Sequence, residues 1–228
     1  MSKRAGRHIA DMQRVIASLR EEELERAYGL LADAFHQDCG IYLCGNGGSA
    51  STASHLAVDL GRAMHGREGR RVRVVSLTDN VPWITAVSND ESFANCFVDQ
   101  LRNYLRPGDV LIGISASGDS ENVVRAFQYA RDAAAGRIAL VGFDGGRLAR
   151  LATHCIWVDS YDYGVVESAH LFVGHLLTNI LIRGESRLPQ AVAVQELTRG
   201  ESDVTAVYGI GNVPAEVCAA DVSAAGRT

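Results

Sequence analysis

The stretch from Cys44 to Arg62, CGNGGSASTASHLAVDLGR, places a glycine-rich turn between a short apolar run and a segment of helical composition. The run that leads into it, IYLCG (41–45), is short and apolar, as a buried strand is. The three glycines of the turn allow positive φ and a close approach of the backbone to a ligand. Ser49 stands where the following helix begins. This order predicts a strand that presents a ligand-binding turn at the start of a helix.

The same alternation continues along the chain. Four more short apolar runs follow, each separated from the next by a segment of helical composition: RVRVVSL (71–77), DVLIGIS (109–115), RIALVGF (137–143) and HCIWVD (154–159). Strands that alternate with helices form parallel sheets with both faces covered. We therefore expect an α/β fold built on a parallel sheet.

The two ends of the chain differ from this middle part. Residues 1–37 carry apolar side chains at helical spacing, which predicts one or two N-terminal helices that pack on the core or on a partner subunit. A core domain is expected over 38–187, with a last helix at about 164–182. Residues 188–228 show no sustained apolar period, so we expect a weakly ordered C-terminal extension there.

Composition limits the classes of function. The net charge is −5, with 27 acidic and 22 basic residues, and Lys3 is the single lysine, so no basic stripe indicates nucleic-acid binding. The five cysteines are odd in number and show no CxxC spacing, which favours reduced thiols and a cytoplasmic location. No run of about 18 uncharged apolar residues occurs, so neither a signal peptide nor a membrane span is expected.

A second loop resembles the first in chemistry. SASGDSEN (115–122) follows an apolar run and precedes a helix. Serine hydroxyls, exposed amides and a helix N-terminus together form a neutral phosphate cradle. For either loop alone, an ordinary turn with Ser120 as an N-cap is an equal alternative, but two such loops at successive strand ends favour the cradle. Neither loop fits GxGxxG or GxxxxGK[ST], so no nucleotide cofactor is expected.

Titratable side chains occur on the helix after the first loop and on the last helix. His55 and Asp59 are four residues apart on one helical face, and Glu167 and His175 lie about 80° apart on the last helix. Each pair alone is compatible with a local salt bridge or a buried histidine. If the two helices meet, two carboxylates and two imidazoles could form an acid–base pair or a divalent-metal site. His170 is rotated by about 140° from His175 and is expected to serve elsewhere.

Four motifs in this order resemble the SIS-domain (sugar isomerase) proteins of the phosphoheptose isomerase group: CGNGGSASTASHLAVDL (44–60), VSND (87–90), GISASGDSENV (113–123) and ESAHLFVGHLL (167–177). The resemblance extends to about Arg183. It implies a doubly wound five-stranded parallel sheet with helices on both faces, assembled as a homotetramer with active sites between subunits. It also implies aldose–ketose isomerisation of sedoheptulose 7-phosphate to a heptose 7-phosphate through an enediol(ate).

The resemblance further implies roles for individual residues. Asp59 would be the general base and His175 the general acid. Zinc or another divalent metal would be held by His55, Asp59, Glu167 and His175. The substrate would be bound by residues of both loops, of the VSND motif and of the last helix: Asn46, Gly47, Gly48, Ser49, Asp90, Ser115, Ala116, Ser117, Ser120 and Glu167.

Three positions depart from the family pattern. Asp59 replaces a glutamate, Glu167 replaces a glutamine, and Ala116 stands where threonine is common. The departures leave two alternatives open, namely an isomerase for a different phosphosugar and a non-enzymatic SIS protein that senses a phosphosugar or acts as an adaptor. A carboxylate at 59 and a histidine at 175 favour an enzyme.

Overall fold

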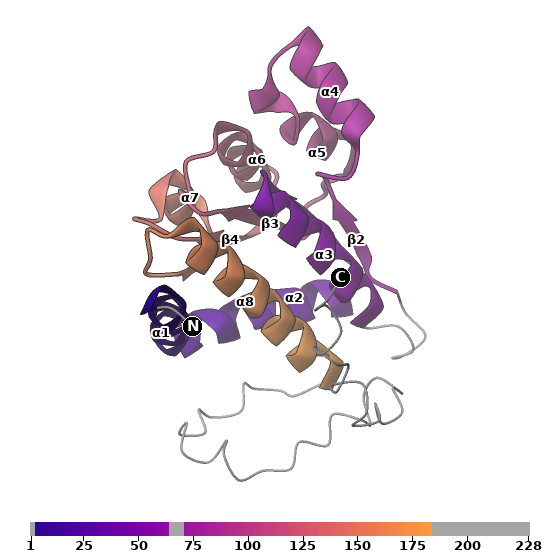
Figure 1. Ribbon diagram of the computed structural model, residues 1–228. Helices are drawn as coiled ribbons and strands as arrows, with labels where there is room; N and C mark the ends of the chain where they lie inside the picture. The colour runs from indigo at the N-terminus through magenta and orange to yellow at the C-terminus, as the bar shows by residue number, and fades with distance from the viewer. Residues whose placement is uncertain (1–2, 64–70, 184–228) are drawn as a thin grey trace, which may run out of the picture. The chain divides into compact units, whose positions relative to one another are not determined.

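The computed structural model of the chain describes residues 3–63 and 71–183, which form an α/β unit around a five-stranded sheet (Figure 1). The strand order is β2-β1-β3-β4-β5, and every neighbouring pair is parallel. The strands are β1 (Gly40–Gly45), β2 (Arg73–Ser76), β3 (Val110–Ser115), β4 (Gly136–Val141) and β5 (His154–Trp157). All five apolar runs of the sequence are strands, each within a few residues of its predicted bounds, and the predicted α/β parallel fold is confirmed.

Helices connect the strands and cover both faces of the sheet (Figure 1). They are α1 (Lys3–Ala17), α2 (Glu21–His36), α3 (Gly48–Ala63), α4 (Val81–Asp90), α5 (Val98–Tyr104), α6 (Glu121–Asp132), α7 (Gly146–Leu151) and α8 (Tyr163–Arg183), with a 3₁₀ turn at Phe93–Asn95. The last helix is one residue longer at each end than the sequence predicted. The N-terminal region forms two helices.

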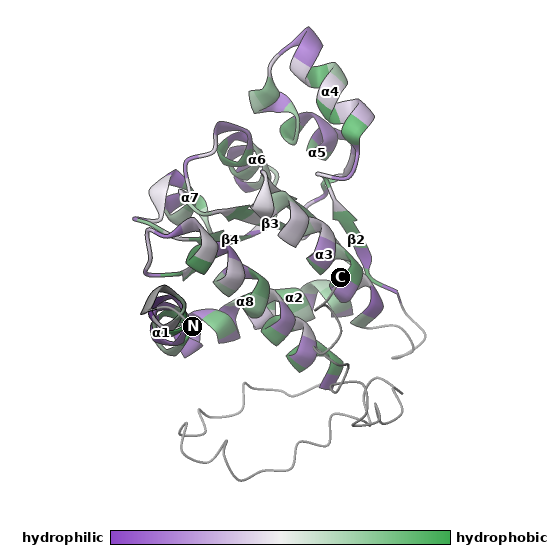
Figure 2. Cartoon of the chain, viewed as in Figure 1, coloured by the Kyte–Doolittle hydropathy of each residue, from purple (hydrophilic) through white to green (hydrophobic). Residues whose placement is uncertain are grey.

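Alternate residues of β1, β3 and β4 enter opposite cores. Ile41 and Leu43 of β1 join the core beneath α2, α3 and α8, whereas Tyr42 and Cys44 join the core beneath α5, α6 and α7. This is the period of two that a strand imposes on its side chains. Strands therefore carry apolar residues on both faces, while most helices carry polar residues on one side (Figure 2).

A smaller third core attaches α1. Val15 is fully buried against Val158, Val165 and Ala169, at the end of β5 and the start of α8. The domain boundaries at 37/38 and 187/188 remain predictions, and the predicted extension at 188–228 lies outside the described residues.

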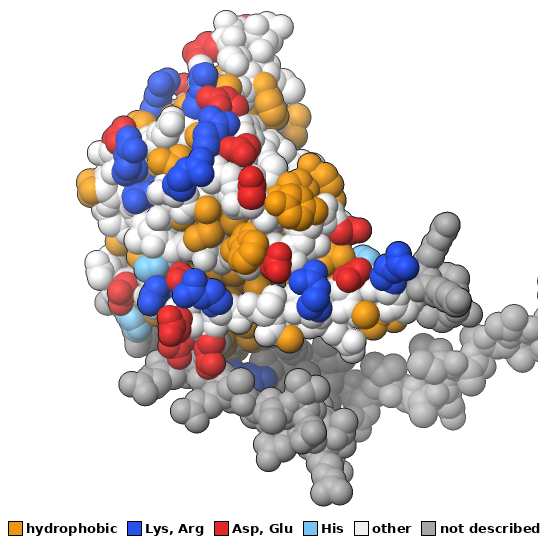
Figure 3. Space-filling view, turned by 90° about the vertical axis from the view of Figure 1, so that its left-hand side faces the viewer, with side chains coloured by type: hydrophobic (Ala, Val, Ile, Leu, Met, Phe, Trp, Pro, Cys, Tyr) orange, Lys and Arg blue, Asp and Glu red, His pale blue; other side chains and the backbone are white. Residues whose placement is uncertain are grey.

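One described helix, α8, is long and apolar enough to cross a membrane by length and composition alone. In this fold 56% of its apolar window is buried, against α3, α2 and the sheet. Since the core helix of a soluble protein passes the same test, its burial accounts for its composition. On the face shown in Figure 3, basic and acidic side chains are interspersed rather than gathered by sign.

Candidate active site

The two predicted ligand loops meet at the point where the order of the strands in the sheet reverses, between β1 and β3. One follows β1 and the other follows β3, and these strands are neighbours in the sheet although β2 lies between them in the chain. In open parallel sheets, ligands bind beyond the carboxyl ends of the strands at this kind of switch point. The topology therefore places the glycine turn and the serine loop side by side.

Paired side-chain amides join the two loops. Asn46 Nδ2 donates to Asn122 Oδ1 at 2.9 Å, and Asn122 Nδ2 donates to Asn46 Oδ1 at 2.9 Å. Asn122 is buried, and its Oδ1 also accepts from the backbone N–H of Val123 at 3.0 Å. Asn122 was not among the predicted site residues. Its position in the second loop gave the only sequence signal, because its partner lies 76 residues away.

The hydroxyls of the serine loop form hydrogen bonds within the loop. Ser115 Oγ lies 3.2 Å from Ser120 Oγ and accepts from the backbone N–H of Gly118 at 3.2 Å. Ser117 Oγ accepts from the backbone N–H of Asp119 at 3.3 Å. Ser120 occupies the N-cap position of α6, but its side chain makes no capping hydrogen bond. The Ser120 side chain therefore does not cap α6, and its hydroxyl lies beside that of Ser115 instead.

Glu167 belongs to the glycine turn. A Cβ at Gly48 would overlap the Glu167 carboxylate, so only glycine leaves room for that group at the first residue of α3. A carboxylate at the N-terminus of a helix is favourably placed in the helix dipole. Gly47 adopts φ +57°, and Ser49 is buried one residue beyond Gly48. Glu167 thus lies against the glycine turn, and its substrate contact remains a prediction.

Three of the four predicted metal ligands converge. His55 Nε2 lies 3.0 Å from His175 Nε2, and Asp59 Oδ2 lies 3.2 Å from His55 Nε2 and 3.5 Å from His175 Nε2. Their side chains are 48%, 29% and 45% exposed for His55, Asp59 and His175. Among the described residues this is the group with metal-ligand geometry, and Glu167 is not part of it.

The donor set of this cluster fits a zinc ion. Two imidazole nitrogens and a carboxylate oxygen are ligands that Zn²⁺ accepts, and tetrahedral ligands at about 2.1 Å from the metal stand roughly 3.4 Å apart. The three observed separations, 3.0, 3.2 and 3.5 Å, lie close to that value.

Close packing of α3 against α8 produces the convergence. A Cβ at Gly174 would overlap the side chain of Leu56, so the two helices approach each other where Gly174 leaves space. His55 and His175 are the chain neighbours of these two residues. The imidazole rings stand edge to face with centroids 4.9 Å apart.

Two other predicted features lie apart from this cluster. Asp90 ends α4, and its Oδ1 accepts from Asn89 Nδ2 at 2.8 Å; within 3–63 and 71–183, no hydrogen bond or ion pair joins it to another predicted site residue. His170 is fully buried, and within the part of the chain that the structure describes neither ring nitrogen has a hydrogen-bond partner of normal geometry, as expected of a residue that faces away from His175.

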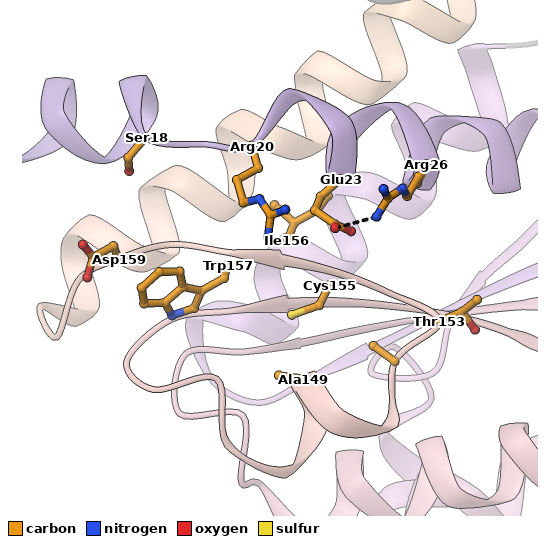
Figure 4. A pocket seen from close by; sticks show the side chains of 11 residues that line it. Ser18, Arg20, Glu23, Arg26, Ala149, Thr153, Cys155, Ile156, Trp157 and Asp159 are labelled. Atoms are coloured by element: carbon orange, nitrogen blue, oxygen red, sulfur yellow. Dashed lines mark hydrogen bonds and ion pairs between the residues drawn. The ribbon is translucent and has the colours of Figure 1, made fainter.

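A separate pocket of about 370 Å³ lies between the N-terminus of α2 and strand β5 (Figure 4). Arg20 and Trp157 border it, Arg26 pairs with Glu23 at 2.9 Å beside it, and Cys155 lies on its floor. Burial raises the pKa of the Cys155 thiol to about 11, so this thiol stays protonated at neutral pH. None of the predicted site residues lines this pocket, so it is distinct from the switch-point site.

Comparisons with known proteins agree with the fold and the motifs. The family described as SIS domain matches residues 6–142, so the chain is an SIS-domain protein. The phosphoheptose isomerase of Aquifex aeolicus is 34% identical over 180 residues, which cover 78% of this chain and 93% of that protein. The chain therefore belongs to the phosphoheptose isomerase family.

Solved structures place it in the same group. The phosphoheptose isomerase of Neisseria gonorrhoeae superposes with a TM-score of 0.71 at 31% identity, covering 78% of this chain and 94% of that one. A phosphoheptose isomerase from Francisella tularensis gives the same TM-score and coverage at 27% identity.

Proposed function

We propose that this protein is an aldose–ketose isomerase that interconverts sedoheptulose 7-phosphate and a heptose 7-phosphate through an enediol(ate) intermediate. The observation that carries the proposal is the approach of His55, Asp59 and His175 on the helix that begins at the glycine turn and on the helix packed against it. This cluster supplies a base and an acid beside a phosphate cradle, in a chain of the phosphoheptose isomerase family.

The separation of the two parts supports a long substrate. His55 lies seven residues along α3 from Gly48, which is about 10 Å along a helix axis, and the turn before Gly48 is hydrogen-bonded to the serine loop through Asn46 and Asn122. A seven-carbon sugar in extended form can span this order of distance from its phosphate to its carbonyl end, whereas a triose phosphate cannot.

The phosphate is bound by the serine loop. Ser115 and Ser117 each accept a backbone N–H, so their own O–H protons can donate to phosphate oxygens, with Ser120 beside them and Ser49 assisting from α3. Asn46 and Asp90 line the sugar chain in this proposal. Hydrogen bonds to a charged group are worth roughly 1.5–3 kcal/mol each, enough to fix the phosphate end.

The proton moves at the other end. Asp59 takes the proton from the carbon beside the carbonyl, the C–H electrons form the C=C bond of the enediol(ate), and the carbonyl oxygen gains the negative charge or a proton. His175 then protonates the former carbonyl carbon from its Nδ1, because its Nε2 faces His55 and Asp59. The hydroxyl on the deprotonated carbon loses its proton to the former carbonyl oxygen and becomes the new carbonyl, and the proton that Asp59 took restores His175. Asp59 Oδ2 faces both imidazoles, so Oδ1 is the oxygen left to accept the proton.

We propose a divalent metal, with zinc as the first candidate, held by His55, Asp59 and His175. When bound, it would polarise the substrate oxygens and favour the enediolate charge. Glu167 remains a proposed substrate contact, and its proposed ligand role requires a movement from Gly48. The half-exposed imidazoles leave room for a partner subunit to close the site, which supports a homotetramer. We place the enzyme in the cytoplasm.

Product analysis tests the proposal. Purified protein is mixed with sedoheptulose 7-phosphate, with and without a chelator, and the products are followed by NMR. We expect a heptose 7-phosphate and loss of turnover after chelation. Absence of product, alongside saturable binding of the ketose phosphate, would favour the sensor alternative.

Ser117→Ala should raise the dissociation constant for the phosphosugar about tenfold or more. Unchanged affinity would place the phosphate elsewhere.

A further inference from the structure

The serine loop contains an electrostatic conflict. Asp119 and Glu121 flank Ser120, and residues 115–122 contain no lysine, arginine or histidine. A phosphate group beside two carboxylates meets repulsion, which lowers its affinity unless a cation compensates.

Arg147 supplies that cation from the first turn of α7, the helix that follows β4 in the chain. Its Nε donates to Asp119 Oδ1 at 3.0 Å, its Nη1 donates to Glu121 Oε2 at 2.8 Å, and its Nη2 donates to the backbone oxygen of Asp119 at 2.7 Å. Its own backbone N–H also donates to Asp119 Oδ1 at 3.1 Å. The guanidinium thus binds both carboxylates and the loop backbone at once.

The backbone at the start of α7 also contacts the backbone of the serine loop. The backbone N–H of Leu148 donates to the Gly118 oxygen at 2.9 Å. Gly118 adopts φ +68°, and a Cβ there would overlap the backbone of Gly145, while a Cβ at Gly146 would overlap the Ser117 oxygen. The segment from Gly145 to Leu148 therefore supports the serine loop directly, and Arg147 projects from that support.

We propose that Arg147 is a positioning residue for phosphate binding, which fixes the serine loop and neutralises its two carboxylates without touching the phosphate itself. Each of its three guanidinium nitrogens already donates to the loop or to Glu121. This inference rests on the proposed function of the serine loop as the phosphate cradle.

Two observations distinguish this positioning role from a contact that only stabilises the fold. The side chains of Arg147, Asp119 and Glu121 are 42%, 51% and 48% exposed, and ion pairs at such exposure contribute little to folding stability. The pKa of Asp119 is lowered, first by the side-chain hydrogen bond from Arg147, so the pair remains ionised at neutral pH. Loss of Arg147 should therefore weaken phosphate binding far more than it destabilises the fold.

Substitution of Arg147 tests the positioning role, with Arg125 as the matched control. Arg125 also donates to Glu121, at 2.9 Å, but its other partner is Asn95 and it makes no hydrogen bond to the loop backbone. We expect Arg147→Ala to raise KM for sedoheptulose 7-phosphate about tenfold or more, with kcat within about threefold of wild type and little change in Tm. Arg147→Lys should recover part of the affinity, and Arg125→Ala should stay near wild type.

Neutralising the carboxylates tests the charge role. In the triple variant Arg147→Ala, Asp119→Asn, Glu121→Gln, KM should fall back toward the wild-type value because the repulsion is gone. A triple variant as weak as Arg147→Ala would overturn charge compensation. An equal rise of KM in Arg125→Ala, or a fall of kcat at unchanged KM in Arg147→Ala, would overturn the positioning role.

Binding of inorganic phosphate by titration calorimetry keeps this test separate from the proposed reaction. If wild type binds phosphate with the same dependence on Arg147 but does not isomerise sedoheptulose 7-phosphate, the reaction is refuted and the inference stands. If wild type turns over and Arg147→Ala binds phosphate as wild type does, the inference is refuted and the reaction stands.

Discussion

At the scale of single residues, Asp59 combines two demands on one short side chain. Its Oδ2 lies within 3.5 Å of both imidazoles, while the proposed reaction needs its other oxygen to reach a substrate C–H. The carboxylate is 29% exposed, so it borders the open side of the cluster. Its reach depends on a chain one methylene shorter than the glutamate of the family pattern.

Asp59→Asn should abolish isomerisation, because an amide cannot accept the proton, while the dissociation constant for the phosphosugar should change little. Asp59→Glu distinguishes two reasons for the short side chain. Higher kcat would mean that aspartate limits reach, and lost activity would mean that the pocket is shaped around it. For both variants, turnover is measured by NMR and phosphosugar affinity by calorimetry. If Asp59 is the base, Asp59→Asn binds the phosphosugar tightly but does not turn it over. Substantial residual kcat in Asp59→Asn would exclude Asp59 as the base.

Asn122 connects the two loops at the same scale. Asn122→Ala leaves the Asn46 amide unpaired and removes a buried partner of the Val123 N–H, which should reduce the free energy of unfolding by about 1–3 kcal/mol. KM for the phosphosugar should also rise, because Asn46 would lose its orientation. Asn103→Ala is the control, since that exposed amide makes only a local bond to the Asp99 oxygen at 3.3 Å. Urea denaturation and steady-state kinetics provide the readouts, and equal effects of the two substitutions would contradict a bridging role.

At the scale of elements, the contact between α3 and α8 sets the geometry of the histidine cluster. Gly174 faces Leu56, and any larger residue would force the helices apart. Because His175 and His55 are the next residues in the chain, a small displacement there separates their ring nitrogens from the present 3.0 Å. Overpacking of a tight core contact costs about 1–3 kcal/mol.

Gly174→Ala should therefore lower both the free energy of unfolding, by about 1–3 kcal/mol, and the affinity for zinc. Gly61→Ala is the matched control on α3, because a Cβ there would meet only Val74, at 4.0 Å. That substitution should leave zinc binding intact and stabilise the helix slightly, since alanine is the better helix former. Zinc titration followed by denaturant unfolding measures both quantities. Unchanged zinc affinity in Gly174→Ala would show that the cluster does not depend on this contact.

The elements were also what the sequence predicted best. Apolar runs of five to seven residues between helical segments identified all five strands of the described residues, because a buried parallel strand has no polar face to disguise it. The site was predicted in part. His55, Asp59 and His175 meet, but Glu167 does not join them, since eight helical residues span about 12 Å along the axis as well as turning by about 80°. Asn122 and Arg147 were missed because their roles come from contacts with segments far away in the chain.

At the scale of the whole molecule, one buried group links the core to pH. His170 is fully buried on the face of α8 that faces the core, and its ring nitrogens lack partners of normal geometry. Burial lowers its pKa from 6.5 to about 4, and the nearby backbone of Val141 offsets this only in part. The folded protein therefore keeps this imidazole neutral under conditions in which the unfolded chain protonates it.

The sign of the effect follows from the protons bound in each state. Between pH 6.5 and about 4 the unfolded chain binds a proton at His170 that the folded chain does not, so stability is complete above pH 6.5 and declines as the pH falls through this window. A shift of this size corresponds to a loss of about 3 kcal/mol of folding stability at the acidic end.

His170→Leu, which fills a similar volume and needs no hydrogen bond, should remove this part of the decline. Urea unfolding at pH 7.0, 5.5 and 4.5, at one protein concentration because assembly contributes to stability, gives the comparison. His154→Gln serves as the control, because His154 is only partly buried and its pKa is lowered in the same direction. Parallel stability curves for wild type and His170→Leu would mean that His170 takes up its proton at the same pH in the folded and the unfolded chain, and the acid sensitivity of the fold would then have to come from its carboxylates.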